Sequence, residues 1–98
     1  MSDTIITFRN ETIREWLKEQ GVDGIYKPYV TPQDVAHRKV YGYLPMWLAA
    51  FAESVSEVSM PRLTPPERER FNRGDMTVQE LDHYGARIAT YQVRALPE

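Results

Sequence analysis

The chain has 98 residues, of which 42% are hydrophobic and 27% charged, with a formal net charge of −2 and no cysteine. This length predicts a single domain, and the lack of cysteine excludes a disulfide framework and thiol catalysis. The slightly negative charge argues against binding of duplex nucleic acid, which needs a broad basic face. No signal-peptide pattern opens the chain, and the longest uncharged apolar run, Tyr41 to Ala52, is shorter than the roughly 20 residues that span a bilayer. We therefore expect a soluble, cytoplasmic protein with no membrane partner.

The first half of the chain alternates strand and helix patterns. Residues 4–8 are β-branched or aromatic, which predicts a strand. Asn10 is a suitable N-cap for a helix over residues 11–20, because apolar side chains there recur on one face. Residues 24–30 predict a second strand, and the proline within it favours an edge position. Residues 39–44 predict a third strand.

The second half continues this alternation. Pro45 precedes the almost wholly apolar segment Met46 to Val55, which predicts a helix buried on more than one side. The second cover is either another subunit or the sheet with its neighbouring loops. The remaining elements are a strand, two polar helical segments and a last strand, expected over residues 57–63, 64–70, 77–85 and 86–96. The order of elements predicts an α/β fold, a small Rossmann-like open sheet of about five strands with helices packed on it, in one domain.

Two places where a predicted strand leads directly into a helix are candidates for a binding site, residues 8–11 and residues 42–45. In open α/β sheets, ligands lie beyond the carboxyl ends of the strands, where helix starts present backbone amides. Arg9 adds a planar guanidinium suited to phosphate, and Gly42 permits close backbone approach. Alternatively, Arg9 is a solvated surface residue and Asn10 only caps a helix. The candidate ligand-binding residues are Arg9, Asn10, Glu11, Gly42, Tyr43, Leu44, Pro45, Trp47 and Arg73.

Few side chains suited to proton transfer or metal binding accompany these junctions. There is no Walker loop or dinucleotide-binding fingerprint, and the two histidines lie far apart without a carboxylate cluster. We therefore expect no metal site and no cofactor. The candidate catalytic residues are Arg9, Asn10 and His37, which has basic neighbours. Tyr43 and Trp47 are candidates for stacking on a base, while Arg73 belongs to a charged segment that either folds over a ligand or is solvated.

Four segments, in this order, resemble the short Csx-type proteins encoded beside type III CRISPR systems, some of which are ring nucleases. The most specific segment is Gly42-Tyr43-Leu44-Pro45 followed by Leu48-Ala49-Ala50. The others are a strand ending at Arg9 before Glu15-Trp16-Leu17, a strand leading to a proline and then Arg73-Gly74, and Gly85-Ala86 before a strand with Tyr91 and Val93.

The resemblance implies a hydrolase or lyase that opens cyclic oligoadenylate, with cyclic tetra-adenylate as the expected ring, and so ends type III CRISPR signalling in antiviral defence. It also implies a homodimer and metal-independent cleavage, in which a ribose 2′-hydroxyl attacks the adjacent phosphate. The family commonly has a histidine where this chain has Asn10. Two alternatives therefore stay open: a cyclic-nucleotide-binding sponge that does not cleave, and a structural dimer subunit.

Overall fold

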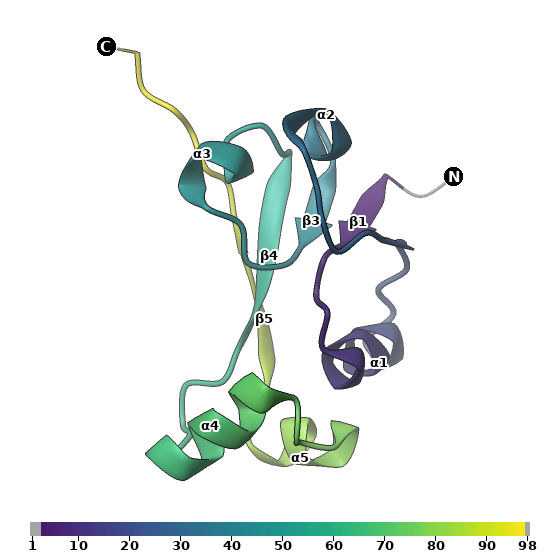
Figure 1. The fold of residues 1–98 in the computed structure, drawn as a ribbon, viewed down its shortest axis with the longest axis vertical. Helices are drawn as coiled ribbons and strands as arrows, with labels where there is room; N and C mark the ends of the chain where they lie inside the picture. Colours follow the sequence, from purple (N-terminus) through teal and green to yellow (C-terminus); the bar gives the residue numbers. More distant parts are fainter. Residues whose placement is uncertain (1–2, 98) are drawn as a thin grey trace.

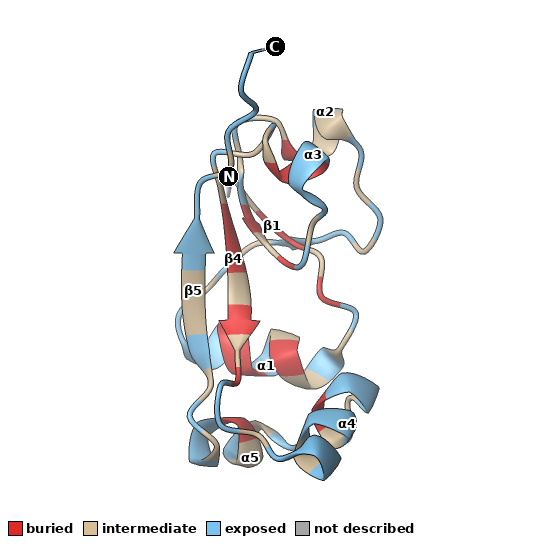
Figure 2. Ribbon diagram, turned by 90° about the vertical axis from the view of Figure 1, so that its left-hand side faces the viewer, coloured by how far each residue is buried: buried red, intermediate tan, exposed pale blue. Residues whose placement is uncertain are grey.

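The computed structural model describes residues 3–97, which form an open sheet with helices on both faces (Figure 1). The strands are β1 (Thr4–Ile6), β2 (Ile25–Tyr26), β3 (Lys39–Tyr41), β4 (Ser54–Ser59) and β5 (Arg87–Tyr91), in the order β2-β1-β3-β4-β5. The first four are parallel, and β5 runs antiparallel to β4 (Figure 2). The helices are α1 (Glu11–Glu19), α2 (Pro32–Val35), α3 (Met46–Ala49), α4 (Pro65–Arg73) and α5 (Val78–His83). This confirms the predicted α/β sheet of five strands.

Two apolar clusters, one on each face of the sheet, hold these layers together. One cluster joins Ile6 of β1 and Val58 of β4 to α1, α4 and α5, and its member Leu17 of α1 is fully buried. The other joins Ile5 and Val40 to α2 and α3. Ile5 and Ile6 serve different clusters because successive side chains of a strand point to opposite faces. Burial of each large apolar side chain contributes about 1.5–3 kcal/mol, so both faces stabilise the sheet. In the part of the chain that the structure describes, no helix is both long and apolar enough to cross a membrane.

Side-chain caps fix where the helices begin. The Oδ1 atom of Asn10 accepts hydrogen bonds from the backbone amides of Thr12 (2.9 Å) and Ile13 (3.2 Å), which confirms the predicted cap of α1. Three further helices begin at capping boxes, in which a threonine and the acidic residue three positions later bond to each other's backbone amides. These pairs are Thr31 with Asp34, Thr64 with Glu67, and Thr77 with Glu80.

The predicted helix over residues 46–55 is wrong in length, because α3 ends at Ala49. The backbone amide of Glu53 donates to the carbonyl of Arg38 (2.9 Å), and the chain then enters β4. There Val55 is buried opposite Val40 of β3. Val55 lies on a strand that is paired on both sides, with β3 and with β5, and a β-branched residue there favours the extended conformation over the helix that the apolar pattern predicts.

Although the residues of α3 are apolar, the rest of the chain does not bury all of them. Leu48 and Ala49 are buried, whereas Met46 is 79% exposed and Trp47 is 64% exposed. The sheet therefore covers one side of α3 only. The final strand is likewise shorter than predicted, because Tyr91 is already opposite Val55 near the start of β4. Beyond Tyr91 the described part of the chain runs past α3 (Figure 1).

Candidate functional site

The carboxyl ends of β1 and β3 lie side by side, which brings the two predicted junctions to one edge of the sheet. Ile6 is paired with Tyr41, and the backbone amide of Thr7 donates to the carbonyl of Tyr41 (2.9 Å). A hollow of about 250 Å³ lies just beyond this pair, and we call it the carboxyl-edge site. It is lined by Thr7, Phe8, Arg9, Pro28, Val30, Tyr43 and Leu44. The structure thus brings together Arg9, Tyr43 and Leu44 of the predicted site.

Arg9 presents an exposed guanidinium at this site. Its guanidinium carbon lies 4.4 Å from the centre of the Tyr29 ring. Among residues 3–97, no carboxylate forms an ion pair with Arg9. Stacking on an aromatic ring restrains a guanidinium while leaving its in-plane N–H donors available. Arg9 is therefore positioned to bind an anion such as phosphate.

A second arginine, which the sequence analysis missed, supports the first. The Nη1 atom of Arg14 donates to the carbonyls of Phe8 (3.0 Å) and Arg9 (2.9 Å). Its guanidinium carbon also lies 4.0 Å from the centre of the Tyr26 ring. Helical side chains lean toward the N-terminus of their helix, so an arginine in the second turn can reach back to the preceding loop. This spacing was the available signal, and Arg14 holds the turn that presents Arg9.

Gly42 is required by Thr7 rather than by a ligand. A Cβ atom built on Gly42 would lie 1.7 Å from the Oγ1 atom of Thr7. The Thr7 hydroxyl in turn donates to the carbonyl of Tyr41 (3.4 Å). The close approach that the sequence predicted at Gly42 is therefore used within the protein, and it fixes a hydroxyl at the carboxyl-edge site.

Tyr43 separates the carboxyl-edge site from a second hollow. Its hydroxyl donates to the carbonyl of Val58 (2.7 Å), and its ring packs edge-on against Phe8, with the ring centres 5.0 Å apart. Burial, and then the nearby Glu57 carboxylate, raise the pKa of the Tyr43 phenol above its ordinary value of 10.0. The hydroxyl thus stays protonated and acts as a donor. The second hollow, of about 370 Å³, runs along the end of β4, and we call it the β4 slot.

Asn10, Glu11 and Arg73 lie close to this edge in sequence or in space but do not line the hollow. Because Asn10 caps two amides of α1, those amides are not available to a ligand. Glu11 is exposed at the first position of α1 and does not line the hollow. A Cβ atom on Gly74 would lie 3.4 Å from Nδ2 of Asn10, so the end of α4 contacts the cap of α1. The Arg73 guanidinium, however, forms ion pairs with Glu69 (3.3 Å) and Asp75 (2.9 Å).

Three further predicted residues do not line the carboxyl-edge site. His37 precedes β3 and therefore lies at the amino end of the sheet, where its backbone amide donates to the carbonyl of Phe51 (2.9 Å). Pro45 is the N-cap residue of α3 and makes no side-chain cap. Trp47 lines a different hollow, of about 540 Å³, together with Met46, Ala50, Phe51, Val93, Arg94 and Ala95. We call this hollow the α3 groove.

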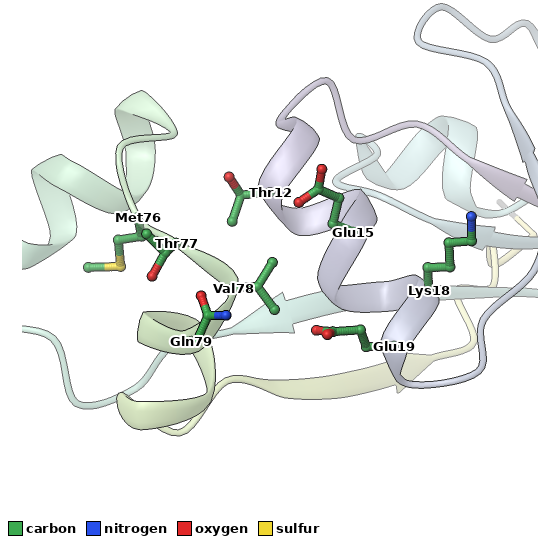
Figure 3. A pocket seen from close by; sticks show the side chains of 8 residues that line it. All are labelled: Thr12, Glu15, Lys18, Glu19, Met76, Thr77, Val78 and Gln79. Carbon is green, nitrogen blue, oxygen red and sulfur yellow. The ribbon is translucent and has the colours of Figure 1, made fainter.

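A larger hollow, of about 720 Å³, lies between α1 and the start of α5 (Figure 3). Its lining carries side chains of both charges and includes none of the predicted site residues. The lining residues are Thr12, Glu15, Lys18, Glu19, Met76, Thr77, Val78 and Gln79. Its charged residues are exposed and solvated. In the described part of the chain, no group of three histidine, cysteine, aspartate or glutamate residues is placed to hold a metal ion.

No protein family, curated protein or solved structure matches this chain. The functional assignment therefore rests on the geometry of the carboxyl-edge site. An unpaired guanidinium and exposed tyrosine rings at one edge of the sheet suit a phosphodiester that carries bases able to stack.

Proposed function

We propose that the protein binds cyclic oligoadenylate at the carboxyl-edge site and opens the ring, with cyclic tetra-adenylate as the expected substrate. The observation that carries this proposal is the unpaired Arg9 guanidinium, held against Tyr29 where β1 and β3 end. A charge-assisted hydrogen bond from a guanidinium to phosphate contributes about 1.5–3 kcal/mol. The place in type III CRISPR-associated defence rests on the resemblance carried by residues 42–50.

Ring opening at this site needs no group beyond the nucleotide and the positioned side chains. A ribose 2′-hydroxyl attacks the adjacent phosphorus, the bond to the 5′-oxygen breaks, and the products are a 2′,3′-cyclic phosphate and a 5′-hydroxyl. Solvent takes the 2′-hydroxyl proton and returns one to the leaving oxygen. Arg9 stabilises charge on the phosphoryl oxygens, and the walls of the hollow hold the attacking oxygen in line. Because His37 lies at the opposite end of the sheet, we expect slow cleavage without general acid–base help, which typically contributes about 10²–10⁴-fold.

A homodimer fits both the ligand and the exposed surface. The hollow of about 250 Å³ is small for a ring of several nucleotides, and a two-fold dimer would present two copies of Arg9 to a symmetric ring. The α3 groove offers an apolar contact surface, since Met46, Trp47 and Phe51 are all about half exposed or more. An exposed apolar patch of this kind is typical of a protein–protein interface.

A binding protein without turnover is the second candidate. It is favoured by Asn10, whose side chain caps α1 and cannot take up a proton from the substrate. Such a sponge would use the same hollow and the same arginine. The two candidates differ in whether one protein molecule converts many rings when the ligand is in excess.

The experiment is to incubate the pure protein with cyclic tri-, tetra- and hexa-adenylate, with and without a chelator, and to resolve the products by chromatography. We expect linear fragments ending in 2′,3′-cyclic phosphate, at a rate that the chelator leaves unchanged. Tight binding without product after long incubation would support the sponge. If no ring binds, the proposal is wrong.

A further inference from the structure

The last part of β4 has an open backbone edge, because β4 is longer than β3. The last paired residue of β3 is Tyr41, opposite Ser56, and the backbone amide of Gly42 donates to the carbonyl of Ser56 (2.9 Å). β4 then continues to Ser59, and no strand among residues 3–97 pairs with it on this side.

Side chains, rather than a strand, contact the carbonyls along this edge. The Tyr43 hydroxyl donates to Val58 (2.7 Å), and Nη2 of Arg68 donates to Met60 (2.6 Å). Between these two contacts lies the β4 slot, which extends across to β5. Its volume of about 370 Å³ falls within the range of small-molecule pockets.

The β4 slot and the carboxyl-edge site share Tyr43 as a wall. The two hollows are therefore neighbours, so that one nucleotide with its phosphate at Arg9 would have to reach around Tyr43 to place its base in the slot. Two tyrosines, Tyr43 and Tyr91, line the slot, and both are about half exposed. Flat, partly exposed aromatic rings are suitable surfaces for stacking a base, which is the part of a nucleotide that lies next to its phosphate and sugar.

Asn72 supplies the polar contact that a base requires. It lies in the last turn of α4, lines the slot, and has an exposed side chain. An amide side chain presents a donor beside an acceptor, and this pair matches N7 and the 6-amino group of adenine. Guanine and hypoxanthine present two acceptors at the same edge and would leave the amide oxygen facing another oxygen.

We infer that the β4 slot is an adenine-specific base subsite, in which Asn72 recognises the base of the nucleotide whose phosphate contacts Arg9. The inference rests on the proposed function for the phosphate contact. It requires neither a particular ring size nor cleavage.

The test is titration of the full chain with AMP, IMP and ribose 5-phosphate, followed by NMR or calorimetry. IMP differs from AMP at the 6-position of the base, and we expect AMP to bind about fivefold or more tightly. Asn72→Ala should reduce the affinity for AMP to that for IMP and leave the affinity for ribose 5-phosphate unchanged. Because Asn72 is exposed on a helix, alanine should preserve the fold. The matched control is Gln79→Ala, an exposed amide in the hollow between α1 and α5 (Figure 3), which should change nothing.

Three results would overturn the inference: no binding of AMP at millimolar concentration, equal affinity for AMP and IMP in the wild-type protein, or an AMP preference that survives Asn72→Ala. Failure of the proposed function gives a different pattern. If Arg9→Ala leaves the affinity for all three ligands unchanged while the Asn72-dependent preference for AMP persists, the base subsite stands and the phosphate contact is wrong. If cyclic tetra-adenylate is opened but AMP and IMP bind equally, the proposed function stands and the base subsite is wrong.

Discussion

Arg9 and Arg14 differ in their contacts at the turn between β1 and α1. Arg9 is unpaired and exposed at the carboxyl-edge site, whereas Arg14 is partly buried and bonded to two carbonyls of the turn. The two stacked rings also differ, since Tyr29 restrains the Arg9 guanidinium and Tyr26 restrains that of Arg14. We therefore propose that Arg9 binds the ligand and that Arg14 positions Arg9.

Arg14→Met tests this division at the level of single residues. The change removes the hydrogen bonds to the carbonyls of Phe8 and Arg9 but keeps an unbranched side chain, so Arg9 loses its fixed position. Hydrogen bonds of this charged type contribute about 1.5–3 kcal/mol, so we expect binding of cyclic tetra-adenylate to weaken by about tenfold. Calorimetry on Arg14→Met, Arg9→Ala and the double variant gives the measurement.

The double variant shows whether Arg14 acts by positioning Arg9 or by contacting the ligand itself. If Arg14 acts through Arg9, adding Arg14→Met to Arg9→Ala should cost little further affinity. Fully additive losses would contradict the positioning role and indicate that Arg14 binds the ligand itself.

At the scale of the elements, the start of α1 depends on Asn10. Loss of an N-cap costs about 1 kcal/mol, so Asn10→Ala should lower the free energy of unfolding by about that amount in urea denaturation. Asn10→Ser keeps a capping oxygen and should restore stability. Because the Asn10 oxygen is already bonded to the amides of Thr12 and Ile13, we expect Asn10→Ser to bind the ring as the wild type does. A stable Asn10→Ser variant that does not bind would show that Asn10 contacts the ligand.

At the start of α2, the Asp34 carboxylate makes a contribution to stability that depends on pH. A hydrogen bond from Lys27, and then one from the Thr31 backbone amide, lower the pKa of Asp34 from 3.8 to about 2. Since the pKa in the folded state is lower than in the unfolded state, the stabilisation by the carboxylate is present above 3.8. It is lost as pH falls through about 2. An NMR titration of the Asp34 carboxyl should therefore have its midpoint near 2, and Lys27→Met should raise it. A midpoint near 3.8 in the wild-type protein would contradict the bonded geometry.

The elements also show which features the sequence can predict. The caps at Asn10, Thr31 and Thr77 are predictable because each side chain bonds to amides only two or three residues away. The end of α3 is not, because it depends on the pairing of Val55 with Val40 in a distant strand. The grouping of Arg9 with Tyr43 follows from the rule that ligands lie at the carboxyl ends of parallel strands. The β4 slot depends on the difference in length between β3 and β4, for which the sequence carries no direct signal.

Away from the carboxyl-edge site and the β4 slot, two regions of the molecule expose several large apolar side chains. One is the α3 groove, and the other is β2 at the opposite edge of the sheet, where Ile25 is 52% exposed. The groove is the expected homodimer interface because its lining is largely apolar and includes the C-terminal segment as well as α3.

Phe51→Glu should convert the dimer into a monomer, since a carboxylate would be buried in an apolar contact without a partner. Ile25→Glu is the matched control, being similarly exposed on β2, and should leave the mass unchanged. Light scattering after size-exclusion chromatography gives the mass of each variant. A Phe51→Glu variant that stays dimeric with unchanged stability would place the interface elsewhere.

We propose that one ring of cyclic oligoadenylate is held by the Arg9 residues of two chains. This claim is tested most directly by calorimetric titration of the wild-type protein and Arg9→Ala with cyclic tetra-adenylate. We expect one ring for every two chains, and an affinity at least about tenfold lower in Arg9→Ala, with an unchanged circular dichroism spectrum. Wild-type affinity in Arg9→Ala would contradict the claim.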